Sequence, residues 1–337
     1  MVVYVENLDV SFGEKQIIHN VSFNVNKGEI IGLFGISGAG KTTIIRVLTC
    51  QINKKNWKGN VRVTNLNPAH TKNHDKILSN MGYVPQLEQL NLYYDLTPLN
   101  NIEIFASCYG MKSKEAKKVA EELFTILDIP KDTWKKPLKK MSGGEKKRVS
   151  MAIGLIHKPD VLFLDEPTTG VDAAKRYDVL SYLKKLNRQL GTTMFLITHD
   201  MEAALVCDKS AILRDGKLLE FDTNYNLISS LPSEGLIARF SIEELNEEKI
   251  SLVKNFPGAT NVKVIRVGND VIEVFMDDFD NSLPKLIEYM IEKDFKIISM
   301  SKDVAEFRRF FQLRIQEEEE KERLMRLHEK EIQVGEV

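Results

Sequence analysis

The stretch Gly35-Ile36-Ser37-Gly38-Ala39-Gly40-Lys41-Thr42-Thr43 decides the fold. The apolar run before it, residues 29–34, predicts a buried strand, and residues 44–48 after it predict a helix. A G-x-x-x-x-G-K-[ST] loop in that setting cradles phosphate, because its backbone N–H groups and the helix N-terminus attract anions. Lys41 supplies a positive charge for the β- and γ-phosphates, and the Thr42 hydroxyl is a natural Mg²⁺ ligand. The stretch therefore predicts a nucleoside-triphosphate site.

The composition is typical of a soluble globular protein with room for two domains. The net charge of the 337 residues is -1, so no basic field favours nucleic acid as a partner. We expect lysine clusters such as Lys146-Lys147-Arg148 to be solvated helix faces. No signal peptide and no run of about 18 apolar residues is present, which predicts a chain without a membrane span. The spacing of the cysteines indicates neither a disulfide framework nor a zinc site: Cys50, Cys108 and Cys207.

Polar residues follow two further apolar runs, 161–164 and 193–198. The first run ends in Asp165-Glu166, and paired carboxylates at the end of a buried strand are costly unless they hold a metal or do chemistry. Asp165 suits the Mg²⁺ shell, and Glu166 suits a general base for water. The second run ends in His199, which is structural in most such settings but here stands beside other functional strand ends. Strands alternating with helices, with polar groups at the carboxyl ends, predict an α/β parallel sheet.

Two features admit a structural and a functional interpretation. Phe12 is either a core residue or a face on which a purine base stacks. Ser142 and Glu145 form an S-x-x-E capping box, which predicts a well-capped helix. The glycines between them also leave the helix start bare, which is typical of a second anion site.

Together these residues resemble the nucleotide-binding subunit of an ATP-binding cassette (ABC) transporter over roughly residues 1–225. Met141, Glu145 and Asn100 differ from the commonest family residues, and none of these differences removes a catalytic group. The family motifs occur in family order: Walker A at Gly35 to Thr42, Q-loop at Gln86, signature at Ser142-Gly143-Gly144, Walker B at 161–166, D-loop at Asp172 and switch histidine at His199.

The resemblance implies a P-loop NTPase (RecA-like) fold: a parallel sheet with an antiparallel β edge and an α-helical subdomain at about 87–157. It implies ATP and Mg²⁺ as cofactors, with Phe12 and residues 35–43 on ATP, and Thr42, Gln86 and Asp165 on the metal. Glu166 and His199 are expected to be catalytic, while Ser142, Gly143, Gly144 and Asp172 face the nucleotide of an opposing subunit. The implied partners are a second copy or a homologous ATPase subunit and a separate integral membrane permease, which places the chain peripherally on the cytoplasmic side of the membrane.

Residues 234–303 predict a second, ferredoxin-like α+β domain. Strands at 236–243, 262–265, 271–275 and 295–298 and helices at 248–256 and 283–293 give the order βαββαβ. Such a domain resembles the accessory domain of the drug- and polysaccharide-export branch of the family. Residues Ser301 to Val304 match only part of the sequence in which that accessory domain usually ends. Residues 304–337 predict a charged helix or tail with Phe307, Phe311 and Ile315 on one face; a solvated tail and a coiled-coil contact are the two interpretations.

The leading hypothesis is an ATPase subunit that powers export through a permease of the ABC-2 type. A soluble cassette ATPase of DNA repair or translation is the alternative among enzymes, but the long coiled-coil insertion and the second cassette of those proteins are not in this sequence. A nucleotide-dependent regulatory module is the alternative from another class, and Glu166 and His199 disfavour it.

Overall fold

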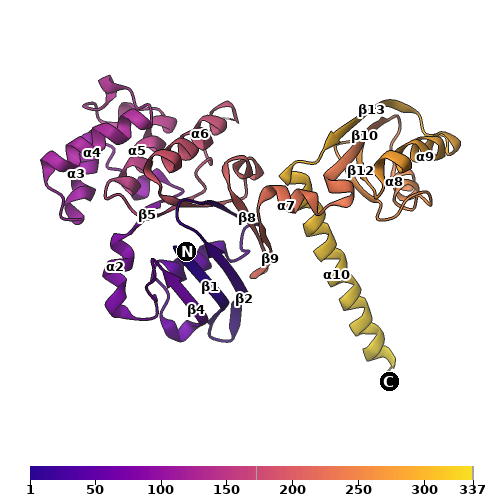
Figure 1. Ribbon diagram of the computed structural model, residues 1–337, viewed down its shortest axis with the longest axis horizontal. Coiled ribbons are helices and arrows are strands. Elements are labelled where there is room, and N and C mark those ends of the chain that lie inside the picture. Colours follow the sequence, from indigo (N-terminus) through magenta and orange to yellow (C-terminus); the bar gives the residue numbers. More distant parts are fainter. Residues whose placement is uncertain (172, 336–337) are drawn as a thin grey trace. The chain divides into compact units, whose positions relative to one another are not determined.

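The computed structural model describes residues 1–171 and 173–335, which form two compact units, Met1–Asp222 and Thr223–Val337 (Figure 1). Each unit has a hydrophobic core of its own.

A six-stranded sheet is the centre of the first unit, and its strand order is β5-β6-β7-β3-β8-β9. All neighbours pair in parallel except β8 and β9, which form an antiparallel hairpin at one edge. The central strands β3, β6 and β7 are almost wholly buried, as continuous apolar runs in a covered parallel sheet require. The predicted parallel sheet is confirmed, with strands β3 (Ile30–Phe34), β5 (Met81–Val84), β6 (Val161–Asp165), β7 (Thr193–Thr198), β8 (Lys209–Arg214) and β9 (Lys217–Asp222).

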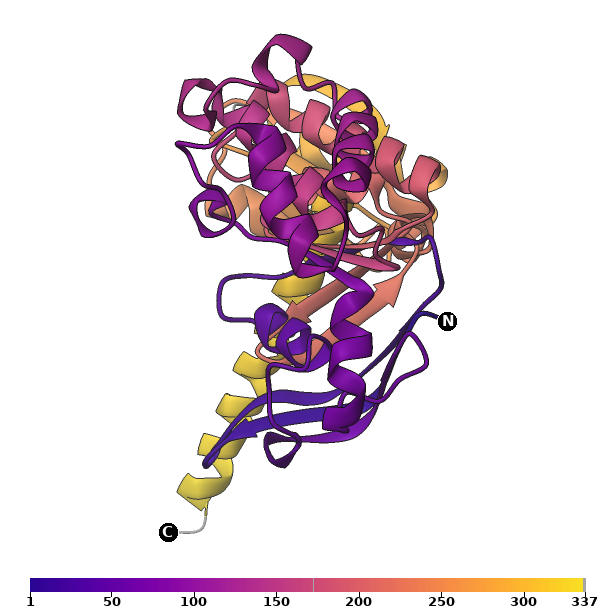
Figure 2. The same ribbon diagram turned by 90° about the vertical axis from the view of Figure 1, so that its left-hand side faces the viewer.

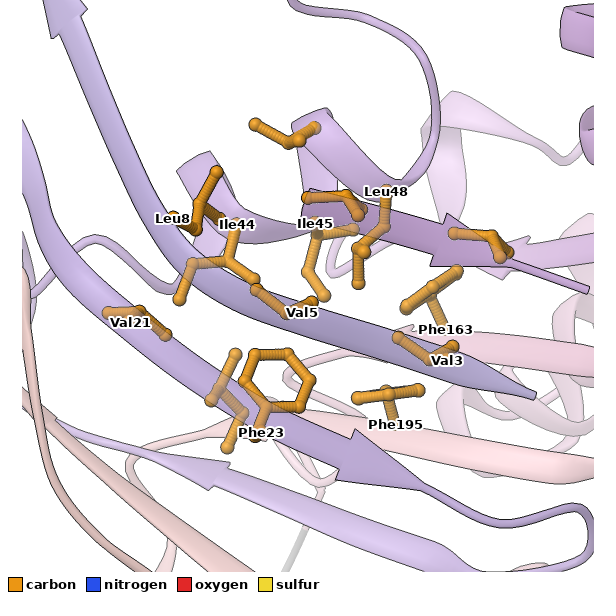
Figure 3. Packing of buried hydrophobic residues seen from close by; sticks show 14 of the residues in the cluster. Val3, Val5, Leu8, Val21, Phe23, Ile44, Ile45, Leu48, Phe163 and Phe195 are labelled. Atoms are coloured by element: carbon orange, nitrogen blue, oxygen red, sulfur yellow. The ribbon is translucent and has the colours of Figure 1, made fainter. Parts of the chain in front are cut away.

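A three-stranded antiparallel sheet, in the order β2-β1-β4, packs against the same core. Its strands are β1 (Val3–Phe12), β2 (Lys15–Val25) and β4 (Trp57–Val63). Figure 3 shows side chains of β1 and β2 meeting those of α1 (Lys41–Leu48) and of the parallel strands, for example Val5, Ile45 and Phe195. The start of α1 is therefore held by apolar contacts from both sheets.

Helices form a separate part of the first unit. Figures 1 and 2 show α3 (Pro98–Cys108), α4 (Ser113–Ile126) and α5 (Gly143–Leu155) gathered at the end opposite the three-stranded sheet. Helix α4 buries Val119 and Leu123 on its apolar face. The remaining helices are α2 (His74–Ser79) and α6 (Ala173–Leu190). The predicted α-helical subdomain is confirmed as part of the fold.

The second unit is an antiparallel sheet in the order β11-β12-β10-β13. Its elements follow the chain as βαββαβ, so the predicted ferredoxin-like arrangement is confirmed. Helix α7 (Asn224–Ser229) precedes the motif, whose elements are β10 (Leu236–Ile242), α8 (Glu247–Lys254), β11 (Lys263–Arg266), β12 (Val271–Phe275), α9 (Phe279–Glu292) and β13 (Ile297–Val304).

The expectation of a solvated tail is wrong for the first turns of helix α10 (Phe307–Gly335), whereas the described residues from Gln316 to Leu327 are exposed or half-buried. Its first turns bury Phe307, Phe310 and Leu313, whereas Phe311 and Ile315 are only half-buried. The predicted apolar face is therefore right at Phe307 and wrong at the other two positions. The physical reason is the second face of the sheet, where Ile237 and Phe275 need a cover that α8 and α9 do not give. Arg309 and Glu317 of α10 form ion pairs with strands β12 and β11.

Candidate functional site

The loop between β3 and α1 has the backbone geometry that phosphate binding requires. Helix α1 begins at Lys41, and Gly40 before it has φ 100°, a left-handed conformation that favours glycine. A Cβ on Gly35 would lie 2.3 Å from the carbonyl oxygen of Leu213. No side chain caps α1, so its first N–H groups face the loop without a side-chain acceptor.

A cavity of about 650 Å³ opens over this loop, and residues at or just after the ends of four parallel strands line it. Most of the candidate residues line it, although they lie far apart in the sequence. They are Ile36, Ser37, Gly38, Ala39, Gly40, Lys41, Thr42, Thr43, Gln86, Asp165, Glu166 and His199, joined by Ile17 and Ile197. The cavity therefore combines an anion-binding loop with two carboxylates, an amide and an imidazole.

Lys41 is held inside the loop. Its Nζ donates to the carbonyl oxygens of Gly35, at 2.5 Å, and Ile36, at 3.0 Å, and only 8% of the residue is exposed. Burial lowers the pKa of Lys41, while the charges of Glu166 and Asp165 act in the opposite direction. The ammonium group thus sits in a polar, partly dry cage where an anion would interact with it strongly.

Asp165 at the end of β6 is bound by Tyr83 of the neighbouring strand β5. The Tyr83 hydroxyl donates to Asp165 Oδ2 at 3.0 Å. Burial raises the pKa of Asp165, and burial together with the Asp165 charge raises the pKa of Tyr83 to about 12. Sequence reasoning missed Tyr83, although the parallel register pairs it with Phe163, two residues before Asp165 and on the same face.

Glu166 has an unusual backbone conformation, and both oxygens of its carboxylate accept hydrogen bonds. Its φ is 46°, a left-handed value that strains a residue other than glycine, and its N–H donates to the carbonyl oxygen of Ile197 at 2.8 Å. Thr198 Oγ1 donates to Oε2 and His199 Nδ1 donates to Oε1, both at 2.8 Å. A carboxylate oxygen accepts, so the Nδ1 proton is on the histidine in this contact. Thr198 is a second residue that sequence reasoning missed.

The helix start at Ser142 lies outside the cavity. Glu145 N–H donates to Ser142 Oγ at 3.3 Å, and Ser142 N–H donates to Glu145 Oε2 at 2.7 Å, so the predicted capping box is confirmed. A Cβ on Gly143 or Gly144 would meet no atom within 4 Å, because both face open space. Ser142 Oγ accepts in the cap and retains its O–H for a ligand, so a second anion site at Ser142 to Gly144 stays a prediction.

Two further candidates have different outcomes. Phe12 at the end of β1 is 47% exposed, so its interpretation as a core residue is wrong. It does not line the cavity, which Ile17 of β2 reaches instead, and base stacking on Phe12 stays a prediction. Asp172 lies outside the described residues.

Lys147 on α5 contradicts the expectation that its lysine cluster is a solvated face, because it is fully buried. Its Nζ donates to the carbonyl oxygens of Pro85, at 3.4 Å, and Gln86, at 3.2 Å. A buried cation needs such acceptors, since water cannot reach it. Lys147 thereby joins the helix that begins at Ser142 to the loop that carries Gln86.

We expect Lys147→Met to loosen the loop around Gln86, because two carbonyl oxygens lose a charged donor worth about 1.5–3 kcal/mol. Hydrogen exchange of the amides in residues 84–90 should be about tenfold or more faster, since 1.4 kcal/mol is tenfold. Lys146→Met, next to it but only partly buried, is the matched control and should leave this exchange unchanged. Equal exchange in both variants would show that Lys147 does not hold the loop.

Comparison with known proteins identifies the arrangement. Residues 18–169 match the family model described as "ABC transporter". The chain is 31% identical over 260 residues to the linearmycin resistance ATP-binding protein LnrL of Bacillus subtilis (strain 168), covering 77% of this chain and 81% of LnrL. It is also 31% identical over 245 residues to the methionine import ATP-binding protein MetN 1 of Oceanobacillus iheyensis, covering 71% of each chain.

A solved structure gives the same result. The dimeric post-hydrolysis state of the ATP-binding cassette MJ0796, bound to ADP and Pi, superposes with a TM-score of 0.57 at 28% identity. The superposition covers 66% of this chain and 98% of MJ0796. Within residues 1–171 and 173–335, none of the helices combines the length and apolar character that crossing a bilayer requires. The coverage and identity of these matches show that the chain belongs to the ABC transporter family, as an ATP-binding subunit that couples ATP hydrolysis to transport.

Proposed function

We propose that this chain drives export through a separate membrane permease, and that two ATPase subunits close around two ATP molecules to do so. One observation carries the proposal. The cavity brings together residues suited to bind and hydrolyse one ATP. The open helix start at Ser142 lies outside this cavity, so an ATP bound there would not reach it. A second subunit can supply the nucleotide that this helix start fits.

The donor set of the cavity fits Mg²⁺. Thr42, Gln86 and Asp165 offer a hydroxyl, an amide and a carboxylate, which are the hard oxygen ligands that Mg²⁺ prefers. The raised pKa of Asp165, caused mainly by burial, indicates a carboxylate that a cation would stabilise. No group of three His, Cys, Asp or Glu side chains that could hold another metal occurs in the described part of the chain. When bound, the ion would neutralise charge on the phosphate oxygens.

The remaining roles follow from the contacts. Lys41 binds the β- and γ-phosphates, and the backbone N–H groups at the start of α1 orient them. Glu166 accepts the proton of the attacking water, because Thr198 and His199 hold its two oxygens toward the cavity. Ser142, Gly143, Gly144 and Asp172 are proposed to contact the nucleotide of the opposing subunit, and Phe12 to stack on the adenine.

The direction of transport rests on two features. LnrL is a resistance protein by name, and the second unit has the ferredoxin-like arrangement that resembles the accessory domain of export subunits. Import is the second candidate, because MetN 1 matches at the same identity. An integral membrane permease and a place on the cytoplasmic side of the membrane complete the proposal.

A strain that carries Glu166→Gln on the chromosome can distinguish export from import. Its ATPase subunit is still made and folded but does not hydrolyse ATP, so only the transport that depends on it should be lost. Under export, we expect the variant strain to become several-fold more sensitive to linearmycin and related membrane-active compounds. Growth on limiting methionine should stay as in the parent. Pull-down of the tagged wild-type chain from membranes in mild detergent should recover a multi-span permease.

The opposite pattern, normal resistance with poor growth on limiting methionine, would favour import. Recovery of no membrane protein, with normal growth in both tests, would favour a soluble ATPase or regulatory role. Glu202→Gln, an exposed carboxylate outside the cavity, serves as the matched control strain.

A further inference from the structure

The Tyr83 hydroxyl contacts the nucleotide site, and the proposed function gives it no role. Tyr83 lies on β5, and its hydroxyl donates to Oδ2 of Asp165, at the end of β6, at 3.0 Å. The parallel register pairs Tyr83 with Phe163, which leaves Asp165 two residues further along on the same face. The contact therefore joins two neighbouring strands at the edge of the sheet where the cavity opens.

The two carboxylate oxygens of Asp165 have different surroundings. Asp165 lines the cavity, whereas Tyr83 does not, so the hydroxyl reaches Oδ2 from outside the cavity. Among the described residues, Oδ1 accepts no hydrogen bond. An ionised carboxylate can bind a cation through one oxygen while the other accepts a hydrogen bond. The contact with Tyr83 thus leaves Oδ1 for a ligand of the cavity.

The strand that carries Tyr83 has a rigid support. A Cβ on Gly82 would lie 2.0 Å from the carbonyl oxygen of Gly154 on α5, so β5 and α5 pack without a side chain between them. The parallel ladder with β6 holds the other side of β5. Packing at such close range admits little movement, so the Tyr83 side chain starts from a fixed backbone.

Tyr83 and Gln86 belong to one short segment that other contacts also hold. Lys147 of α5 donates to the carbonyl oxygens of Pro85 and Gln86. The hydroxyl of Tyr83 joins Asp165 to this same segment. Gln86 and Asp165, two of the three ligands proposed for Mg²⁺, are in this way placed relative to each other through Tyr83.

We propose that Tyr83 is a positioning residue for the divalent cation, because it holds Oδ2 of Asp165 so that Oδ1 is presented to the ion at a fixed place. The inference rests on the proposed function, in which Asp165 belongs to the Mg²⁺ shell. Hydrogen-bond partners of this kind orient a metal ligand, and the loss of one typically lowers metal affinity by about 10–100-fold. Tyr83 does not line the cavity, so it acts on the ion through Asp165 alone.

A fixed carboxylate also favours a small ion over a large one. Mg²⁺ demands near-ideal octahedral geometry with bonds of about 2.0–2.1 Å, whereas Ca²⁺ accepts flexible arrangements with bonds of about 2.3–2.6 Å. A carboxylate that can turn adapts to Ca²⁺ more easily than to Mg²⁺. Tyr83 should therefore raise the affinity for Mg²⁺ more than the affinity for Ca²⁺, which a contribution to folding stability alone would not do.

Tyr83→Phe tests the proposal, because it removes the hydroxyl and keeps the ring. The full chain is held in excess over ADP, and electron paramagnetic resonance of free Mn²⁺, an ion with the same oxygen ligands, measures the metal affinity of the complex. The Mn²⁺ affinity should fall about tenfold, the lower end of the usual effect. In competition against Mn²⁺, the loss should be larger for Mg²⁺ than for Ca²⁺. ADP affinity in EDTA should be unchanged, because the phosphate-binding loop is intact.

Tyr93→Phe is the matched control. Tyr93 is 53% exposed and Tyr83 45%, but the Tyr93 hydroxyl has no hydrogen-bond partner among the described residues. Its removal should leave the Mn²⁺ affinity, the competition by Mg²⁺ and Ca²⁺, and the ADP affinity as in the wild type.

Asp165→Asn shows whether Tyr83 acts through the carboxylate. This change removes the charged ligand and should weaken Mn²⁺ binding by more than Tyr83→Phe does. Adding Tyr83→Phe to Asp165→Asn should cause less than about a twofold further loss, which is within the usual error of additivity. A full tenfold further loss would show that Tyr83 acts by another path, and the inference would be wrong.

The same variants distinguish a failure of the inference from a failure of the proposed metal site. Wild-type Mn²⁺ affinity in Asp165→Asn would remove Asp165 from the metal shell, and the inference would fall with it. Weak Mn²⁺ binding in Asp165→Asn but not in Tyr83→Phe would overturn the inference alone. Equal losses of Mg²⁺, Ca²⁺ and metal-free ADP affinity in Tyr83→Phe would overturn it as general damage to the site. Tighter Mn²⁺ binding in Tyr83→Phe would overturn it too, because the hydroxyl would then compete with the ion.

Discussion

Glu166→Gln is expected to lower the rate of ATP hydrolysis by about 10²–10⁴-fold, the usual worth of general-base assistance. The amide has the size of the carboxylate and still accepts a hydrogen bond from Thr198, but it cannot take a proton from water. ATP affinity should be unchanged, because Lys41 and the loop backbone bind the phosphates. Phosphate release at saturating Mg-ATP measures the first effect, and calorimetric titration with ATP measures the second.

Two further variants serve as controls for this measurement. Glu202→Gln removes an exposed carboxylate outside the cavity and should hydrolyse ATP as the wild type does. Lys41→Ala should lose both binding and hydrolysis, because backbone donors alone leave the γ-phosphate under-neutralised. Wild-type turnover in Glu166→Gln would remove Glu166 from the catalytic role.

The same variant shows whether two chains close around ATP. In light scattering, Glu166→Gln should be dimeric with Mg-free ATP and monomeric with ADP, because ATP binds the closed pair and not the single chain. Adding Ser142→Arg fills the helix start and should restore the monomer. A dimer that survives Ser142→Arg would leave Ser142 with its capping role alone.

The sequence predicted the parallel sheet and the residues of the cavity because each depends on local pattern. Buried strands appear as continuous apolar runs, and parallel strands bring the groups that follow them to one edge. Asp165, Glu166 and His199 could therefore be placed together from their positions after such runs. Periodicity also predicted the βαββαβ order of the second unit.

The residues that sequence reasoning missed depend on register or on tertiary contact. Tyr83 reaches Asp165 only because β5 and β6 pair in one particular register. Lys147 occurs in a basic cluster that looks solvated, and its burial depends on the position of the Gln86 loop against α5. The first turns of α10 looked like part of a charged tail, because the sheet face that they cover is formed by strands more than 30 residues earlier in the chain.

A buried charge cluster holds the first turns of α10 against the sheet, and its loss should lower the stability of the second unit strongly. Glu273 on β12 is fully buried, and Arg239 of β10 donates to its Oε1 through Nη2 at 2.6 Å. Arg309 of α10 donates to both carboxylate oxygens. One carboxylate thus connects two strands and the helix, and within residues 1–171 and 173–335 the hydrogen bonds that offset its burial come from the two arginines.

Glu273→Gln should therefore destabilise the second unit by about 3 kcal/mol, the lower end of the cost of breaking a buried ion pair, because Arg239 is half-exposed and can hydrate. Hydrogen exchange of the slowest β10 and β12 amides should be about 100-fold faster, since 1.4 kcal/mol is tenfold.

The first unit should be unaffected by this substitution. Both tryptophans, Trp57 and Trp134, lie in the first unit, so unfolding followed by tryptophan fluorescence should be unchanged. Glu247→Gln, which breaks the exposed pair with Arg266, is the matched control and should cost about 0.5 kcal/mol or less. Replacing Glu273, Arg239 and Arg309 together by leucine or methionine should recover most of the loss, because no unpaired charge then remains. If Glu273→Gln exchanges no faster than Glu247→Gln, the charge cluster around Glu273 does not hold α10 on the sheet.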